Sequence, residues 1–314
     1  MKTQEPTNQG MHSFMNVPVV TDLDELQADI AFIGIPYGTP YVMDHSPIWA
    51  APGYLREVSA RFVNSLGPGY NFDFGGELLD GREVRIVDCG DVPGNPMDVA
   101  GTVLDGARAV KAILDAGAVP IVFGGDDSVP IPVARAYETH GPITVIQIDQ
   151  HLDFKHERHG VTEGYSSRMR RISEMYWVQQ VFQIGQHGIG SALTSDLQDA
   201  LAAGNTIVTE REVHERGIGS VLDRIPDGLD YFITVDFDGL DPSIAPAVSH
   251  PEPGGLTFHE ASDLLCGLAR KGRVVGMDMV EFVPAHDLHG LGARTAGRLI
   301  LNLIAAMVRA GQFD

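Results

Sequence analysis

The chain has 314 residues, of which 44% are hydrophobic and 20% are charged. This composition is typical of a folded globular protein and excludes wholesale disorder. Asp and Glu number 42 against 22 Lys and Arg, so the formal net charge is −20. We therefore expect no binding to nucleic acid or to an anionic membrane surface, whereas a cationic small molecule would be attracted.

The cysteine content and the start of the chain indicate the compartment. Cys89 and Cys266 are the only two cysteines and cannot make a disulfide framework, which fits a reducing environment. Residues 1–20 are polar and contain prolines, unlike the apolar core of a signal peptide, and we expect no run long enough to span a membrane. These features predict a cytoplasmic protein.

Short runs rich in Val and Ile alternate along the chain with longer segments of helical period. This alternation predicts strand-helix-strand units around a mostly parallel sheet. The expected strands are residues 29–34, 84–88, 119–123, 144–148, 181–184, 206–208, 231–235 and 274–277. The expected helices are residues 98–116, 192–203, 259–271 and 290–309. Eight strands fit either an open wound sheet or a closed barrel.

The remaining pattern indicates one domain. The last expected helix has an apolar face, typical of a helix that covers a sheet. That face consists of Leu299, Ile300, Leu303 and Met307. Gly and Pro cluster in residues 67–96, which we interpret as long surface loops. We expect residues 1–28 to be an N-terminal extension and residues 29–314 to be a single catalytic domain.

Acidic residues gather directly after three of the expected strands, where open α/β sheets bind their ligands. The segments are Gly-Gly-Asp-Asp-Ser at 124–128, Asp-Gln-His-Leu-Asp at 149–153 and Asp-Phe-Asp-Gly-Leu-Asp-Pro at 236–242. A single Asp at a strand end is most often a helix N-cap or a turn former. No capping requirement explains all three segments together, so their combination predicts a ligand site.

Alternate residues of extended chain point the same way, which groups the acidic side chains of each segment. The grouped side chains are Asp149, His151 and Asp153, then Asp236 and Asp238, with Asp127 as a sixth. Five carboxylates and one imidazole would repel one another strongly unless cations lay among them. Two divalent ions would neutralise most of this charge. The oxygen-rich set with one nitrogen favours Mn²⁺, ahead of Mg²⁺, Co²⁺ or Ni²⁺.

These segments resemble the motifs of the ureohydrolase family of arginases and agmatinases. Two further motifs complete the resemblance, Pro-Gly-Gly-Leu-Thr at 253–257 and Met-Val-Glu-Phe-Val-Pro at 279–284. The similarity runs from about residue 32 to residue 312. It implies a three-layer α/β/α sandwich with a mostly parallel eight-stranded sheet. The loop after Asp153 lacks the Ser-Gly-Asn segment of arginases, so the chain is more similar to agmatinases.

The resemblance also implies a role for each matched residue. Asp149 and Asp236 would bridge two metals, with Asp127 and Asp153 completing one site and His151 and Asp238 the other. Glu281 would grip the substrate guanidinium through a two-pronged hydrogen bond. A metal-bridging hydroxide would attack the guanidinium carbon while Asp153 accepts a hydrogen bond from it, and urea and an amine would leave.

Two positions depart from the family pattern. Asp127 stands where the family has His, which makes one metal site all oxygen. Glu163 stands where the family places a proton-shuttling His. Glu163 is our candidate to take over that role, with His156 and His159 of the same loop as alternatives.

Residues near the motifs bear on the substrate tail. His250 is the candidate specificity residue, with a structural loop role as the alternative. Arg168, Arg170 and Arg171 follow Glu163. If one of these arginines points into the cleft, the substrate carries a carboxylate; if all point outward, an agmatine-like substrate fits better. A charged helix face is the commoner arrangement, so we expect the agmatine-like substrate.

The sequence therefore predicts a metal-dependent amidinohydrolase that splits an agmatine-like guanidino compound into urea and an amine. Its cofactors would be two divalent ions, Mn²⁺ first and Ni²⁺ or Co²⁺ next, and the resemblance implies a homo-oligomer, trimer or hexamer. Alternative substrates are a guanidino acid such as guanidinobutyrate, free guanidine or a substituted biguanide. The rival hypothesis is a non-catalytic partner subunit of a ureohydrolase hetero-oligomer, which draws support from the two lost histidines. A deacetylase-like amide hydrolase is a third reading, and Glu281 argues against it.

Overall fold

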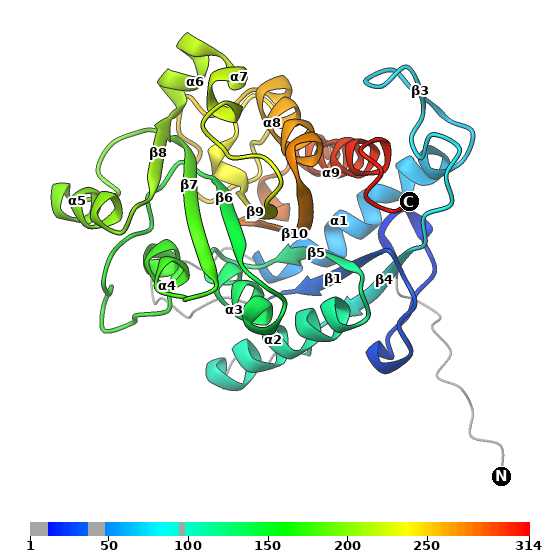
Figure 1. The fold of residues 1–314 in the computed structure, drawn as a ribbon, viewed down its shortest axis with the longest axis horizontal. Helices are drawn as coiled ribbons and strands as arrows, with labels where there is room; N and C mark the ends of the chain where they lie inside the picture. Colours follow the sequence, from blue (N-terminus) through cyan, green and yellow to red (C-terminus); the bar gives the residue numbers. More distant parts are fainter. Residues whose placement is uncertain (1–11, 37–47, 94–97) are drawn as a thin grey trace.

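The computed structural model describes residues 12–36, 48–93 and 98–314. Its centre is a parallel eight-stranded sheet in the order β4-β1-β5-β10-β9-β6-β7-β8 (Figure 1). The strands are β1 (Ile30–Ile35), β4 (Ile86–Asp91), β5 (Val119–Gly124), β6 (Ile143–Ile148), β7 (Val178–Gln186), β8 (Thr206–Thr209), β9 (Asp230–Asp236) and β10 (Arg273–Val280). Each overlaps one expected strand. Because β4 and β8 are the two ends of the order, the sheet is open and not a barrel.

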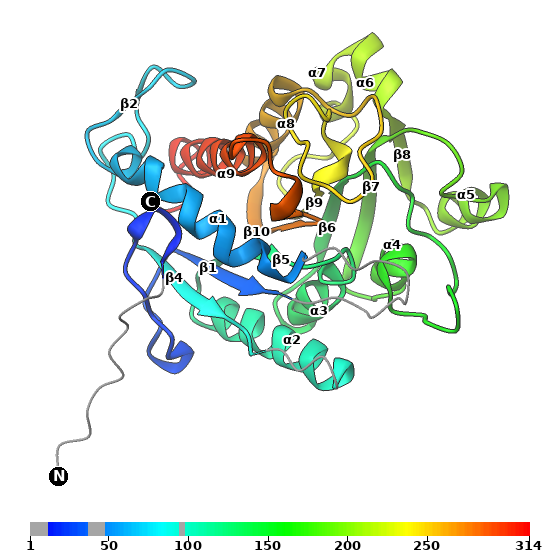
Figure 2. The same ribbon diagram turned by 180° about the vertical axis from the view of Figure 1, so that it is seen from behind.

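Helices cover both faces of this sheet (Figures 1 and 2). One face carries α1 (Ala51–Ser59), α8 (Phe258–Lys271) and α9 (Leu291–Arg309). The other carries α2 (Val99–Asp115), α3 (Pro130–Arg135) and α4 (Arg168–Ser173). Helices α5 (Thr194–Ala202), α6 (Glu210–Arg216) and α7 (Ile218–Leu222) lie toward the β8 end of the sheet. The predicted three-layer α/β/α sandwich is thus confirmed.

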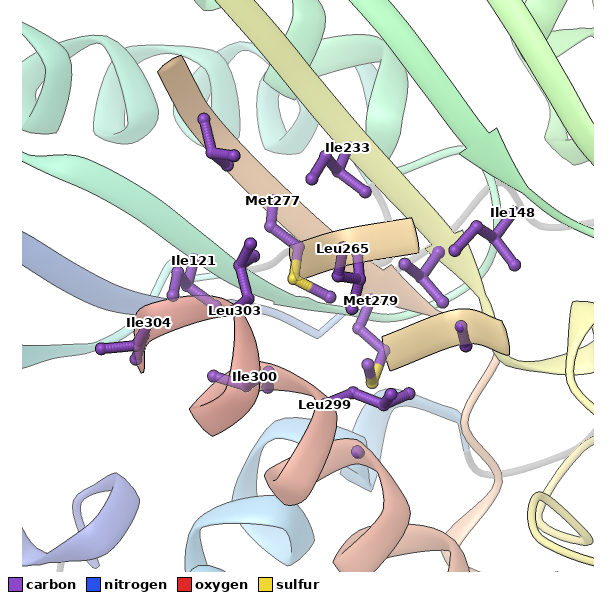
Figure 3. Packing of buried hydrophobic residues seen from close by; sticks show 14 of the residues in the cluster. Ile121, Ile148, Ile233, Leu265, Met277, Met279, Leu299, Ile300, Leu303 and Ile304 are labelled. Atoms are coloured by element: carbon purple, nitrogen blue, oxygen red, sulfur yellow. The ribbon is translucent and has the colours of Figure 1, made fainter. Parts of the chain in front are cut away.

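The strands are rich in apolar residues because both faces of the sheet are largely buried. In β5, Ile121 and Phe123 pack toward α8 and α9, while Val122 packs toward α2 and α3. Figure 3 shows the first of these cores, where Met277 and Met279 of β10 meet side chains of α8 and α9. Each fully buried aliphatic side chain contributes about 1.5–3 kcal/mol to folding.

Helix α9 is the central element of that core. All four residues of its predicted apolar face are fully buried. By length and composition α9 could cross a membrane, contrary to our expectation for any segment of the chain, but 83% of that apolar window is buried inside the fold. It is therefore a core helix of the kind that covers a sheet.

Two segments depart from the expected organisation. The described part of the N-terminal extension packs into the domain, because the ring of Phe14 lies 4.6 Å from that of Phe32 and 4.9 Å from that of Phe123. Residues 1–11 of the extension lie outside the described residues. Within 67–96, expected as loops, a small hairpin forms from β2 (Tyr70–Asn71) and β3 (Gly76–Glu77), and residues 94–96 lie outside the description.

The sheet order places the motif segments side by side. Strands β5, β10, β9 and β6 are consecutive neighbours, and each ends in one of the acidic motifs. The chain leaves β5 for β6 while β9 and β10 lie between them, so the sheet opens a crevice at the carboxyl ends of these strands. All the candidate site segments converge on this crevice.

Candidate active site

The two consecutive acids after β5 have different roles. Asp126 forms a local turn, accepting hydrogen bonds from the backbone N of Ser128 at 2.8 Å and from its hydroxyl at 2.5 Å. Asp127 turns inward and is 3% exposed. Neither of its carboxylate oxygens accepts a hydrogen bond of ordinary geometry, although the guanidinium of Arg168 lies against Oδ1. The first acid therefore has the common structural role, and the second faces the crevice.

The segment after β6 brings three more polar side chains into the crevice. The fully buried Asp149 accepts a hydrogen bond from the backbone N of His151 through Oδ1. Its Oδ2 accepts from the side-chain amide of Gln147 at 2.5 Å and from Arg168. His151 lies with Nδ1 3.2 Å from Oδ2 of Asp238. Asp153 has a φ of 46°, an unusual conformation for a residue other than glycine.

The segment after β9 packs directly against the segment after β6. Asp236 accepts a hydrogen bond from the backbone N of Asp238 at 2.9 Å, and Asp238 accepts from the backbone N of Gln150 at 3.3 Å. After Asp236 the chain makes a short 3₁₀ turn, Phe237–Gly239. A Cβ on Gly239 would lie 2.6 Å from the backbone N of Asp149. Only glycine therefore allows the two acidic segments to approach this closely.

Glu281 follows β10 and closes the group. Its backbone N donates to the carbonyl of Gly125 at 2.9 Å, and its Oε1 accepts from the backbone N of Asp127 at 2.8 Å. Its φ of 63° places it in the left-handed region, as at Asp153. Such strain is costly for a residue with a side chain and is concentrated at functional sites.

The structure brings all six predicted metal ligands together, in two groups. Within each group, the potential ligand atoms all lie within 4.8 Å of one another. The first group is Asp149, His151, Asp236 and Asp238. The second group is Asp127, Asp149 and Asp153.

The electrostatics of these groups call for a cation. Burial raises the pKa of Asp127, Asp149 and Asp236 well above the ordinary value, and neighbouring carboxylates add to this effect. Burial opposes protonation of His151, but the carboxylates of Asp238, Asp149 and Asp153 outweigh it and raise its pKa to about 10. A divalent ion would relieve the same repulsion. Carboxylate oxygens with one imidazole nitrogen fit such an ion in the first group.

Arg168 is a site residue whose position the sequence reading did not foresee. Its guanidinium is fully buried and lies against Asp127 and Asp149, with Nη2 3.6 Å from Oδ2 of Asp153. Nη1 also donates to the hydroxyl of Thr234 at 3.1 Å. The available signal was helical period, because Arg168 shares a face of α4 with the buried Ile172.

The other two arginines of this run point away from the crevice. Arg170 pairs with Asp199, and Arg171 pairs with Glu174 at 3.1 Å. Both partners are about half exposed, so these are surface ion pairs. Neither arginine lines the cavity above the acids.

A cavity of about 680 Å³ lies over the acidic groups. The acidic side chains that line it include Asp127, Asp153, Asp236, Asp238 and Glu281. Besides His151, the basic side chains that line it are Lys155, Arg158, His159 and His250. One cavity therefore combines an acidic cluster with a group of basic residues.

The proton-shuttle candidates lie in different places. Glu163 is outside the cavity: its side chain is 44% exposed and pairs with Arg135. His156 is exposed and does not line the cavity either. His159 does line it and has a φ of 54°. The structure thus places only the last of the three where it can reach a bound molecule.

Comparison with known proteins agrees with this architecture. The family model described as the arginase family matches residues 28–306. The chain is 30% identical to putative agmatinase 1 of Schizosaccharomyces pombe, covering 96% of this chain and 83% of that protein. It is 27% identical to the mitochondrial guanidino acid hydrolase of Homo sapiens, covering 95% and 83%. The solved structure of proclavaminate amidino hydrolase from Streptomyces clavuligerus superposes with a TM-score of 0.82 at 27% identity, covering 95% and 97%.

The chain therefore belongs to the arginase family. Its fold is the arginase-like sandwich, and its relatives support a ureohydrolase that acts on guanidino compounds. The first ligand group fits the divalent metal chemistry of this family. The second differs, because Asp127 replaces the family's His and Arg168 lies among its acids.

Proposed function

We propose that this protein is a metal-dependent amidinohydrolase that hydrolyses a guanidino acid to urea and an amine-bearing acid. The observation that carries the proposal is the position of Glu281, which lines the same cavity as His151 and Asp238 of the first ligand group. A carboxylate in this position suits a planar guanidinium, because the two groups form paired, charge-assisted hydrogen bonds. A neutral amide would gain nothing from such a carboxylate, which argues against amide hydrolysis.

The residues divide the work of the reaction. Asp149, His151, Asp236 and Asp238 would hold a divalent ion, which would lower the pKa of water and so supply the nucleophile at neutral pH. Mn²⁺ is our first choice, with Ni²⁺ and Co²⁺ next. Glu281 holds the guanidinium and orients its central carbon. Burial raises the pKa of Glu281, an effect to which Asp126 adds, so a cationic substrate stabilises its ionised form. Asp153 would accept a hydrogen bond from the attacking water, and His159, which lines the same cavity, would carry a proton to the leaving amine.

The basic residues of the cavity bear on the choice between the two kinds of substrate tail. Lys155 lies 2.9 Å from Asp196, and Arg158 donates to the hydroxyl of Ser166 at 3.2 Å while its guanidinium lies 5.5 Å from the ring centre of Tyr165. Two cations beside the cavity favour a substrate that ends in a carboxylate. We therefore place a guanidino acid such as guanidinobutyrate ahead of agmatine, reversing the preference drawn from net charge and from the arginines of α4.

A urea-release assay tests this proposal. The purified chain, loaded with Mn²⁺, Ni²⁺ or Co²⁺, is offered guanidinobutyrate, guanidinopropionate, agmatine, free guanidine and alkylated biguanides. We expect metal-dependent urea release, fastest with a guanidino acid. Faster release from agmatine would contradict the carboxylate tail. No urea from any of them would overturn the enzyme and favour a non-catalytic partner subunit.

Assembly and location stay predictions. Helix α5 and the residue before it expose a stripe of leucines at four-residue spacing, which suits packing against another copy of the chain. The stripe consists of Leu193, Leu197 and Leu201. Light scattering after gel filtration would check the predicted trimer or hexamer, and cell fractionation the predicted cytoplasmic location.

A further inference from the structure

We infer that the guanidinium of Arg168 occupies the place of the second metal, so that each chain binds one divalent ion. The ion would be held by Asp149, His151, Asp236 and Asp238. This inference rests on the proposed function only in expecting that a metal is bound. It departs from the two-metal centre that the family resemblance implies.

The contacts of Arg168 match the ligands of that second metal. The resemblance assigns the second ion to Asp127 and Asp153 together with the bridging Asp149 and Asp236. The Arg168 guanidinium lies against Asp127 and Asp149 and approaches Asp153 to 3.6 Å, so it meets three of these four carboxylates. A divalent ion and a guanidinium cannot occupy the same space between these carboxylates. The side chain is fully buried, and expelling it would separate a buried charge from its partners, which is strongly unfavourable.

The hydrogen bonds of Asp149 support the same conclusion independently. To bridge two metals, this residue would have to offer one oxygen to each. Its Oδ2 is already engaged by the amide of Gln147 at 2.5 Å. That amide is held in place by Gln183, whose Nε2 donates to Gln147 Oε1 at 2.6 Å and whose Oε1 accepts from Asn205 at 2.9 Å. Oδ2 thus accepts from two side chains, Gln147 and Arg168, whereas Oδ1 accepts from the backbone N of His151, so Oδ1 is the oxygen better able to accept a metal as well.

The residue at 127 fits an arginine better than the histidine it replaces. An ionised Asp forms an ion pair with a guanidinium, whereas a histidine in that position would compete with Arg168 as a second cation or leave it unpaired. The carboxylate of Asp127 accepts no hydrogen bond of ordinary geometry, so Arg168 is its main electrostatic partner. In this chain the acid at 127 and the arginine at 168 thus form an ion pair where the resemblance implies a histidine and a metal.

Metal content tests the inference directly. The full chain is stripped with EDTA, reloaded with excess MnCl₂ or NiCl₂, passed through a desalting column and analysed by plasma mass spectrometry. We expect one ion per chain for the wild type and none for His151→Ala. Arg168→Met, which removes the charge but keeps much of the side-chain length, should raise the content toward two ions. Arg168→Lys, which keeps the charge, is the matched control and should stay at one.

Circular dichroism identifies any variant that fails to fold, and the wild-type count decides the inference without the variants. Two ions per wild-type chain, or none, would overturn it. A folded Arg168→Met that stays at one ion in excess metal would also overturn it, because Arg168 would then not be what excludes the second ion. Urea release reports separately on function: one ion without urea contradicts only the proposed activity, and two ions with urea contradict only this inference.

Discussion

Replacing Gly239 by Ala should loosen the metal site through the backbone alone. The added Cβ would lie 2.6 Å from the backbone N of Asp149, 2.7 Å from its Cα and 3.0 Å from the carbonyl carbon of Ile148. These are backbone atoms, so no side chain can rotate away. Ordinary contact begins at 3.4 Å, so the segments after β6 and β9 must separate by about 0.8 Å. Metal-ligand distances tolerate only about 0.2 Å.

We therefore expect Gly239→Ala to weaken Mn²⁺ binding at least about tenfold, as disturbed ligand positions generally do. Overpacking should also cost about 1–3 kcal/mol of stability. The measurements are isothermal titration with MnCl₂ and thermal unfolding with and without the ion. Gly219→Ala in α7 is the matched control, because a Cβ there meets no atom within 4 Å. Wild-type affinity and melting temperature in Gly239→Ala would refute the claim that the two acidic segments form one rigid metal site.

Three further changes separate the roles assigned to individual residues. Glu281→Gln should reduce urea turnover by at least about a hundredfold, the usual loss for one electrostatic group, while Glu163→Gln should stay near wild type. Equal turnover in the two variants would contradict the position of Glu281 in the active site and of Glu163 outside it. Arg158→Ala should raise KM for guanidinobutyrate by about tenfold and leave KM for free guanidine unchanged. An equal change in both KM values would mean that Arg158 does not bind the carboxylate of the substrate. Burial raises the pKa of Asp278 to about 7, from an unfolded value of 3.8, so its ionised form destabilises the folded protein increasingly from about pH 4 to pH 7. Metal-free Asp278→Asn should therefore be more stable than wild type at pH 8, by at most about 4 kcal/mol, and less so at pH 5; parallel denaturation profiles would contradict this sign.

The sheet was predictable because its strands are short apolar runs and the longer helices are strongly periodic. Both the apolar runs and the helical period reflect burial, and both can be detected within a short stretch of sequence. The hairpin of β2 and β3 was missed because two-residue strands have no periodicity to detect. The burial of Phe14 was missed as well, since it depends on a distant contact with Phe32 and Phe123.

The sequence predicted which acidic residues and which histidine form the site, but not which side chains pair with one another. Acids at the ends of parallel strands converge when those strands are neighbours. The family motifs implied that the strands preceding them are neighbours, as they are in the sheet. The sequence could not show that Glu163 points out of the cavity and pairs with Arg135, because the conformation of its loop determines where the side chain lies. It also left Arg168 among three arginines with similar surroundings. Helical period, which puts Arg168 on the same face of α4 as Ile172, was the one signal that could have separated it from the other two.

The most direct test of the account is an anomalous diffraction map from crystals soaked in MnCl₂. We predict a strong manganese peak bounded by His151, Asp149, Asp236 and Asp238. Absence of a peak among these side chains, or side chains that face away from one another, would contradict the claim that the ends of β6 and β9 form a metal-binding active site.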